Sequence, residues 1–503
     1  MSDTANLDTN QIQGNILDGF NKDHQTFLFL RFTDPGLART WLAATKDEVA
    51  TSAEVADYNA LFKRVHSRRG HASNVVQATW MNLAFTSAGL TALGVAEDEL
   101  GQFPDEFRAG LVGHAADLGH VGSSAPENWR PAFRSPETVH AVMIVAADDH
   151  EDLQQAIERF MESMGAHGVD VADRLDGDAR SDEKGHEHFG FKDGVSQPAV
   201  AGYGGAAAAG SGHLDPIQPG EFIIGYPTEP ATETEPAPTA PSSYGQPPTP
   251  PTPPPSTDPG PASSGGPAWA VNGSFLVVER LLQNVKAFEV DTAAQAAAAG
   301  VPDVELFRSK LVGRHKSGCP MELVEGGPDA STVDVGLADP SVLEPDKINN
   351  FGYALDPDGT TVPRGAHIRK ANPRDAEIPG VASVRAHRII RRGIAFGDSY
   401  HPTAPLDSPG HADSERGLIF ACYQSSIQRG FEFIQETWVN NPGFPKDGDG
   451  ADPILSEGGA KPFALPGATS TPFDTGGWIT MTGGAYFFQP SIDALDHLAT
   501  IGS

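Results

Sequence analysis

The chain has 503 residues, of which 39% are hydrophobic and 20% charged, and it contains 26 phenylalanines and 6 tryptophans. These numbers favour a soluble globular protein with a substantial core, built as one large domain or two fused domains. Acidic residues outnumber lysine and arginine by 66 to 35, for a formal net charge of −31. Such a surface repels nucleic-acid phosphates and anionic lipid.

The sequence shows no membrane span, signal peptide or cysteine motif. No apolar run reaches the length of about 18 residues that a transmembrane helix needs, and the opening residues lack the basic and apolar regions of a signal peptide. Cys319 and Cys422 are the only cysteines and form no CxxC pair, which argues against a disulfide framework and a thiolate zinc site. We expect no nucleic-acid or membrane partner and a cytoplasmic location, with export by another route left open.

The first part of the chain predicts an α+β unit. Runs rich in aromatic and β-branched residues predict strands at 26–33, 78–86 and 139–147. Helices are predicted at 36–63 and 150–165, the latter with apolar residues at helical spacing. The mixture lacks a strict βαβ alternation, which indicates an α+β rather than an α/β arrangement.

A composition change follows. Residues 204–213 are rich in Gly and Ala, and residues 227–267 hold 15 of the 42 prolines. Such a segment buries little apolar area and lacks many backbone donors, so it predicts an extended, exposed excursion. Two interpretations stay open: a loop without activity, and a proline-rich ligand for a partner.

The second part repeats the α+β character. Strands and helices are again predicted, the strands at 273–279, 386–390, 418–423 and 485–488 and the helices at 285–299 and 302–312. Between Arg364 and Arg392, eight Lys or Arg residues stand against two acids, Asp375 and Glu377. A positive cluster in so acidic a chain suggests a bound anion. The alternative is a basic face paired with acidic groups elsewhere.

One motif holds a single carboxylate on a tight turn. In GFKDGVSQP (190–198), Asp193 stands between two glycines, and taken alone most such aspartates cap turns. Together with four further segments in the same order, however, the motif resembles the GxxDG signature of the dye-decolorizing peroxidases, a family of haem peroxidases. Those segments are IQGNILDGFNKDHQTFLFLRF (12–32), HIRKANPR (367–374), HRIIRRGIAFG (387–397) and GLIFACYQSSIQRGFEFIQ (417–435).

The resemblance implies an α+β fold of two ferredoxin-like antiparallel-sheet halves packed together, of the dimeric α+β barrel type. Haem b is then held mainly by the C-terminal half. We predict that residues 1–205 form the N-terminal half and end in the GxxDG motif. Residues 206–270 are then an exposed insertion, and residues 271–503 the haem-binding half.

The same resemblance assigns the cofactor-binding residues. His367 matches the histidine that ligates the haem iron. Arg369 and Arg374 are the candidate partners of the haem propionates, because guanidinium groups suit carboxylates, although both could equally be solvated or paired with acids. Asp452 best matches the acid that accepts the second N–H of the histidine, and Asp474 is the second choice.

On the opposite side of the haem, the resemblance gives Asp193 the role of proton relay and Arg391 that of charge stabiliser. Arg392 is adjacent to Arg391, and the sequence alone leaves a register error of one residue open. Leu418 and Phe420 match apolar residues that line this side and limit access to the iron.

Two features depart from a simple pattern. Phe396 stands where relatives often carry a tyrosine that relays electrons to the surface, so a relay here would need another residue, such as Tyr423 or Trp438. His186 and His188 point the same way in an extended segment but have no obvious third ligand, so we do not predict a non-haem metal there.

The resemblance therefore predicts an enzyme that uses hydrogen peroxide to oxidise dyes, phenolics or other small one-electron donors. Two alternatives remain: a manganese-dependent peroxidase of the same fold, and a haem carrier or sensor with little turnover. The presence of both Asp193 and Arg391 counts against a carrier, because binding alone needs neither.

Overall fold

The computed structural model describes residues 7–69, 77–204, 216–230, 261–323, 349, 351–375, 383–404, 410–411, 414–456, 459–468 and 473–502. Most of the proline-rich segment therefore lies outside the described residues. Its two ends lie inside, and they meet: Pro227 forms an antiparallel bridge with Ala262, and the Thr228 amide donates to the Pro261 carbonyl at 3.0 Å. The domain limits at 205 and 270 stay predictions.

The N-terminal half is an antiparallel sheet with the strand order β4-β1-β3-β2. Its strands are β1 (His24–Phe32), β2 (Thr79–Phe85), β3 (Ala141–Ala147) and β4 (Val169–Asp178). Helices α2 (Pro35–Thr45) and α3 (Ser52–Arg69) connect β1 to β2, and α7 (His150–Ala166) connects β3 to β4. This succession is the βαββαβ arrangement of a ferredoxin-like unit.

The C-terminal half repeats that arrangement. In it, β11 (Ile479–Gln489), β5 (Ser274–Gln283) and β8 (Gly417–Gln424) are neighbours in this order, and the short strands β6 (Ile390–Arg391) and β7 (Ile394–Phe396) both pair with the outer side of β8. Helices α9 (Val285–Ala299), α10 (Val304–Val312) and α13 (His367–Ala371) follow β5, and the π-helical segment η9 (Gln428–Val439) follows β8. The predicted fold of two ferredoxin-like halves is thus confirmed.

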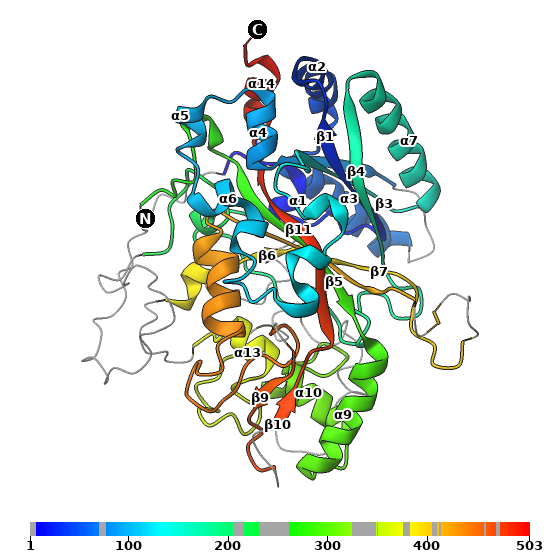
Figure 1. Ribbon diagram of the computed structural model, residues 1–503, viewed down its shortest axis with the longest axis vertical. Coiled ribbons are helices and arrows are strands. Elements are labelled where there is room, and N and C mark those ends of the chain that lie inside the picture. The colour runs from blue at the N-terminus through cyan, green and yellow to red at the C-terminus, as the bar shows by residue number, and fades with distance from the viewer. Residues whose placement is uncertain are drawn as a thin grey trace.

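The two halves share one nine-stranded sheet. Strands β2 and β11 join them through the pair Phe85–Phe488, and Figure 1 shows β11 and β5 running through the middle of the molecule. The far edges of the sheet also approach each other: a Cβ added to Gly177 of β4 would lie 2.4 Å from Cγ2 of Ile394 in β7. The sheet is therefore strongly curved.

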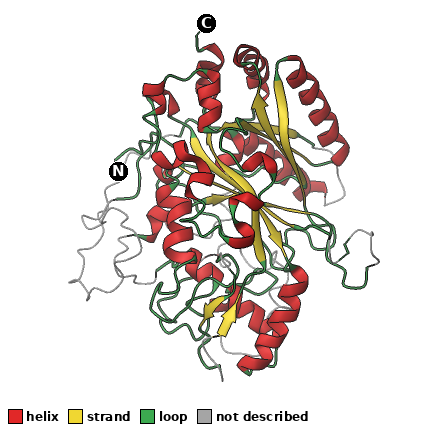
Figure 2. Cartoon of the chain, in the orientation of Figure 1, coloured by secondary structure: helices red, strands yellow, loops and turns green. Residues whose placement is uncertain are grey.

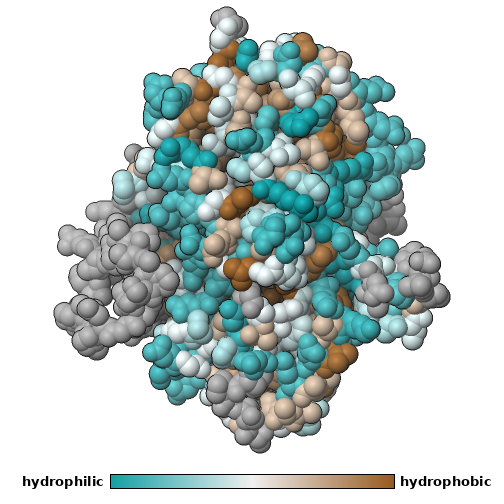
Figure 3. All heavy atoms as spheres, viewed as in Figure 1, coloured by the Kyte–Doolittle hydropathy of each residue, from teal (hydrophilic) through white to brown (hydrophobic). Residues whose placement is uncertain are grey.

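Shorter elements complete the chain and cover the sheet (Figure 2). These are the helices α1 (Gly14–Leu17), α4 (Ser87–Leu93), α5 (Glu97–Leu100), α6 (Asp105–His114) and α14 (Ile492–Thr500), and a small sheet of β9 (Lys461–Phe463) and β10 (Phe473–Thr475). All seven residues of β3 are buried. The face shown in Figure 3 is largely hydrophilic, with scattered hydrophobic groups. Among the described residues, no helix combines the length and apolar character of a membrane span.

Several elements differ from the sequence prediction. Residues 386–390 are not a strand: η8 (Val384–His387) is a 3-10 turn, and only Ile390 continues into β6. The helical stretch predicted at 36–63 is two helices, α2 and α3. Strand β4, with the sequence VDVADRLDGD, was not predicted because an edge strand with half-exposed side chains tolerates charge and loses the usual apolar pattern.

Helix α4 packs directly on the backbone that precedes β3. A Cβ added to Gly89 would lie 1.8 Å from the carbonyl oxygen of His140, so Gly89→Ala should destabilise the protein by on the order of 3 kcal/mol. Gly165 of α7 is the matched control, since a Cβ there meets nothing within 4 Å and alanine should stabilise the helix by about 0.5–1 kcal/mol. Denaturant unfolding of both variants would measure this contrast, and equal stabilities would contradict it.

Candidate active site

The GFKDGVSQP segment forms a turn that is fastened to β6. Gly194 has a φ of 69°, a left-handed conformation that favours glycine. Gln197 exchanges two hydrogen bonds with the backbone of Arg391: its Nε2 donates to the carbonyl at 2.9 Å, and its Oε1 accepts from the amide at 3.0 Å. The turn that carries Asp193 is therefore held against Arg391.

The side chains of Asp193 and Arg391 form an ion pair. Nη1 of Arg391 donates to Oδ1 of Asp193 at 3.2 Å, and Nη2 donates to the Ser196 carbonyl at 3.2 Å. The side chains are 30% and 32% exposed, respectively. The pair thus places a carboxylate that can take up a proton beside a fixed positive charge, and both remain accessible to a small molecule.

Strand pairing decides which arginine belongs to this site. Arg391 lies opposite Cys422 of β8, and directly opposite residues of antiparallel strands share a face of the sheet. Side chains alternate along a strand, so Phe420 and Leu418 lie on that same face. Both are half-buried. The structure thus brings Arg391, Leu418 and Phe420 to one face, as a shared site requires.

Arg392 points the other way. Its guanidinium donates to the carbonyl oxygens of Asn15, Ile16 and Leu17 in α1, at 2.8 to 3.1 Å. Arg392 therefore ties the second half of the chain to its start, and Arg391 rather than Arg392 lies beside Asp193.

His367 is the first residue of α13 and is paired with a buried acid. Its Nδ1 lies 2.8 Å from Oδ2 of Asp452, whose side chain is fully buried. The other oxygen of Asp452 accepts hydrogen bonds from the amides of Ile454 and Leu455. Because an ionised carboxylate can only accept, Nδ1 carries the proton, and the lone pair of a neutral ring is left on Nε2. Asp474, the second choice, is exposed on β10.

Lys370 holds the loop that carries Asp452. It lies one turn after His367 in α13, and its Nζ donates to the carbonyls of Asn441, Phe444 and Gly450 at 2.6 to 2.7 Å. Burial lowers the pKa of Lys370 to about 7, while the charges of Asp452 and Asp449 oppose the shift. The same short helix thus fixes both the histidine and the segment that supplies its carboxylate.

Arg369 is turned to the protein interior. Its guanidinium donates to Oδ2 of Asp356 at 3.1 Å and to the carbonyls of Asp356 and Val362, and it lies 4.5 Å from the ring centroid of Tyr353. Both members of the Arg369–Asp356 pair are buried. These contacts join the guanidinium to the loop before α13.

The positive cluster resolves into paired and unpaired charges. Four of its eight basic residues pair with carboxylates, namely Arg364, Arg369, Arg385 and Arg391. Lys370, Arg374 and Arg392 donate to backbone carbonyls. Arg388 has neither a hydrogen bond nor an ion pair with any residue that the structure describes. Burial, together with the neighbouring charges of Arg374, Arg385 and Arg391, lowers its pKa to about 9.

Asn349 connects the two parts of the site. Its Nδ2 donates to the Val195 carbonyl in the GFKDGVSQP segment at 2.6 Å, and its own carbonyl accepts from Nη1 of Arg374 at 2.7 Å. Its Oδ1 accepts from Nη2 of Arg314. The Asp193 turn and the His367 segment therefore meet around Asn349. Asn349 and Arg314 were not predicted because nothing local in the sequence marks them, whereas Arg388 was visible as one member of the positive cluster.

Other candidates from the sequence have structural contacts. His387 stacks on Phe433 with ring centroids 3.7 Å apart, and burial lowers its pKa to about 4. His186 and His188 contact backbone carbonyls, those of Lys184 and Lys316 for the first and of Phe396 for the second. Tyr423 and Trp438, the alternatives for an electron relay, are both fully buried, so neither reaches the surface itself.

A buried acid lies behind the apolar wall of the site. Phe431 of η9 contacts Phe420, with ring centroids 6.1 Å apart, and the next residue, Glu432, accepts a hydrogen bond from the Tyr486 hydroxyl at 3.0 Å. Burial raises the pKa of Glu432 from 4.5 to about 8, with the charges of Glu106, Glu436 and Asp117 acting in the same direction.

Because this pKa is raised, the folded protein holds a proton on Glu432 that the unfolded chain releases. Its contribution to stability is therefore full below about pH 4.5 and is lost as the pH rises through about 8. Glu432→Gln should reduce the fall of the thermal midpoint between pH 5 and pH 8. The accompanying change in the free energy of unfolding should not exceed about 1.4 kcal/mol for each unit by which folding raises the pKa of Glu432. Identical slopes in the two proteins would show that Glu432 does not titrate in this range.

Taken together, these residues suit a metal-centred cofactor with acidic side groups. Nε2 of His367 offers a lone pair to a metal, and Arg388 is a cation without a counter-ion among the residues that the structure describes. The Asp193–Arg391 pair offers an acid–base group and a positive charge on the same site. This combination of groups defines the class of haem-dependent peroxidases.

Comparison with known proteins gives the family. Residues 11–181 match the DyP dimeric alpha+beta barrel domain, and residues 257–448 match the C-terminal domain of Dyp-type peroxidases. The chain is 31% identical to the dye-decolorizing peroxidase msp1 of Mycetinis scorodonius, covering 98% of this chain and 88% of that protein. It is 30% identical to a dye-decolorizing peroxidase of Auricularia auricula-judae, over 98% of this chain and 87% of the other.

Comparison with solved structures leads to the same family. A variant of the dye-decolorizing peroxidase of Pleurotus ostreatus superposes with a TM-score of 0.79 at 29% identity, covering 99% of this chain and 100% of that one. An ancestral D-type dye-decolorizing peroxidase gives a TM-score of 0.76 at 32% identity, over 98% and 99% of the two chains. The chain belongs to the DyP-type peroxidase family, whose members are haem enzymes, and it is a peroxidase.

Proposed function

We propose that the protein binds haem b through His367 and uses hydrogen peroxide to oxidise dyes, phenolics or other small one-electron donors. Bound haem supplies the oxidising iron, and the chain supplies the ligand, the proton transfer and the access route. Relatives that share almost the whole chain carry dye-decolorizing peroxidase in their names, which supports dyes as the substrate class. The cytoplasmic location stays a prediction.

With haem bound, His367 would hold the iron through Nε2, and Asp452 orients the ring by accepting the Nδ1–H. Arg388 and Arg374 are the candidate partners of the propionates. Arg388 is favoured over Arg369 because it has no partner among the described residues, whereas Arg369 is engaged by Asp356. Guanidinium groups form paired hydrogen bonds with carboxylates.

In the peroxide reaction that bound haem would support, Asp193 would accept a proton from one peroxide oxygen and deliver it to the other, and Arg391 would stabilise the negative charge that develops. Leu418 and Phe420 restrict the space beside Arg391. The observation that carries this proposal is the Asp193–Arg391 ion pair, linked through the Val195–Asn349–Arg374 contacts to the segment that holds His367.

One purification and one assay test the function. We expect the purified protein to show a haem Soret band and to bleach a dye only when hydrogen peroxide is added, without need of manganese. A Soret band without turnover would identify a haem carrier or sensor instead. Bleaching that requires added Mn²⁺ would identify the manganese-dependent alternative, and a colourless protein that takes up no haem would overturn the proposal.

A further inference from the structure

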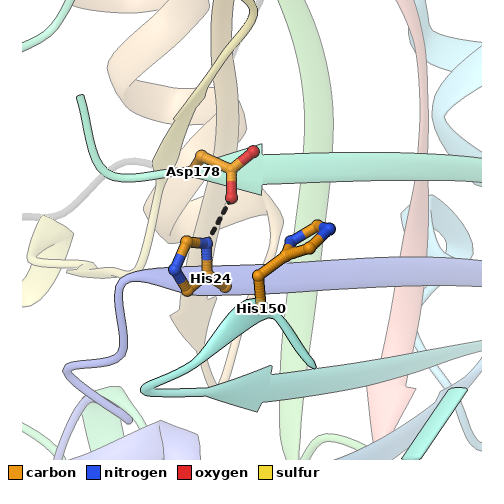
Figure 4. Close-up of side chains that lie close together, drawn as sticks. All are labelled: His24, His150 and Asp178. Carbon is orange, nitrogen blue, oxygen red and sulfur yellow. Dashed lines mark hydrogen bonds and ion pairs between the residues drawn. The ribbon is translucent and has the colours of Figure 1, made fainter. Parts of the chain in front are cut away.

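Three side chains at one end of the N-terminal sheet lie within metal-binding distance of one another. His24 is the first residue of β1, Asp178 is the last of β4, and His150 is the first of α7. One ligand atom from each lies within 4.8 Å of those of the other two. Figure 4 shows the three side chains converging from these separate segments. This cluster shares no residue with the candidate active site.

Secondary structure places the three donors together. His24 lies directly opposite Asp178 in the β1–β4 ladder, so both side chains emerge on the same face of the sheet. His150 follows the end of β3 by three residues, and Asp149 caps its helix by accepting the Glu151 amide at 2.8 Å. Since strands and a capped helix hold all three, the donors are positioned by rigid elements.

The contacts within the cluster leave donors free for an ion. Nδ1 of His24 lies 2.6 Å from Oδ1 of Asp178, and the rings of His24 and His150 are 5.5 Å apart. The imidazole of His150 makes no hydrogen bond to any residue that the structure describes. The nearby lysines do not oppose a cation, because Lys22 pairs with Asp148 and Lys184 with Asp23.

We propose that His24, His150 and Asp178 bind a divalent transition-metal ion of the zinc type. Two imidazoles and one carboxylate are ligands that Zn²⁺ prefers, whereas Ca²⁺ and Mg²⁺ prefer oxygen ligands alone. Zn–N bonds of about 2.0–2.1 Å place tetrahedral ligand atoms about 3.3 Å apart, which side-chain rotation can reach from the observed cluster. When the ion binds Nδ1 of His24, the proton of the neutral ring lies on Nε2. Because two of the ligands are exposed, water completes the coordination of the ion.

The test uses the chelator-treated, haem-loaded protein and Zn²⁺ alone as the probe. Calorimetric titration with Zn²⁺ and a count of zinc per chain should show one ion bound by the wild type. His24→Ala and His150→Ala should each weaken binding by about tenfold or more, since even the loss of an outer-shell partner of a metal ligand costs 10–100-fold. His167→Ala is the matched control, because His167 lies at the other end of α7 and contacts the Ser163 carbonyl.

Stability and competition provide independent readouts. Zinc should raise the thermal midpoint of the wild type and of His167→Ala, but not that of His150→Ala, because an ion that joins β1, β4 and α7 stabilises only the folded state. Excess Ca²⁺ or Mg²⁺ should not displace the zinc. Asp178→Asn keeps the side-chain shape and repeats the test if an alanine variant folds poorly. Absence of stoichiometric zinc binding by the wild type, or equal binding by the cluster variants and the control, would overturn the proposal.

Discussion

Asp193→Asn should slow the reaction of the haem-loaded protein with hydrogen peroxide by about 10²–10⁴-fold, the usual contribution of a general acid–base group, without loss of haem. Asparagine keeps an oxygen that can accept from Nη1 of Arg391 and from the Gly194 amide, but an amide cannot take up the proton. Stopped-flow measurement of the peroxide reaction, together with haem content per chain, separates a loss of chemistry from a loss of cofactor.

Two further variants define the role of Asp193. Arg391→Leu removes the fixed positive charge and leaves the carboxylate, so it should slow the same step while haem stays bound. Asp358→Asn is the control, because that side chain is 87% exposed and pairs only with Arg364 among the described residues. If Asp193→Asn reacts at the wild-type rate, the proton passes by another route, and Arg391 with an ordered water becomes the better candidate.

His367→Ala should leave the purified protein with a small fraction of the wild-type haem. The variant removes the nitrogen that the Asp452 hydrogen bond leaves free for a metal, and with it the protein's strong bond to the iron. His401→Ala, which changes an exposed histidine of the same half, should keep full haem content. Haem per chain, measured from the Soret band and the protein concentration, decides between the two outcomes.

Asp452→Asn tests the same site more specifically, because it keeps His367 and changes only which ring nitrogen carries the proton. The amides of Ile454 and Leu455 would hold the asparagine oxygen, so the amide NH₂ would face Nδ1 of His367. Nδ1 must then accept, the proton moves to Nε2, and haem affinity should fall by about 10–100-fold. Normal haem content in His367→Ala would instead direct attention to His387, although its Nδ1 already contacts the Arg429 carbonyl.

Local patterns in the sequence predicted the main elements and singled out the candidate site residues. Strands β1, β3 and β8 contain apolar runs because they are buried in the sheet, and α7 shows helical spacing because one of its faces packs on that sheet. The positive charge near His367 was also visible, because it runs against the −31 of the whole chain. The resemblance to the family supplied the roles proposed for Asp193, Arg391 and His367.

The partners of those residues depend on contacts between segments far apart in the chain. Arg391 and Arg392 are adjacent residues of the same type, and only the pairing of β6 with β8 turns the first toward Asp193 and the second toward the carbonyls of α1. Similarly, Arg369 and Arg388 differ in that one meets Asp356 and the other meets no counter-ion among the described residues. Composition and spacing determine which groups are present, whereas the strand register and the loops that cross between the halves determine which of them meet. Pairing across nearly 200 residues, as between Asp193 and Arg391, has no local trace in the sequence.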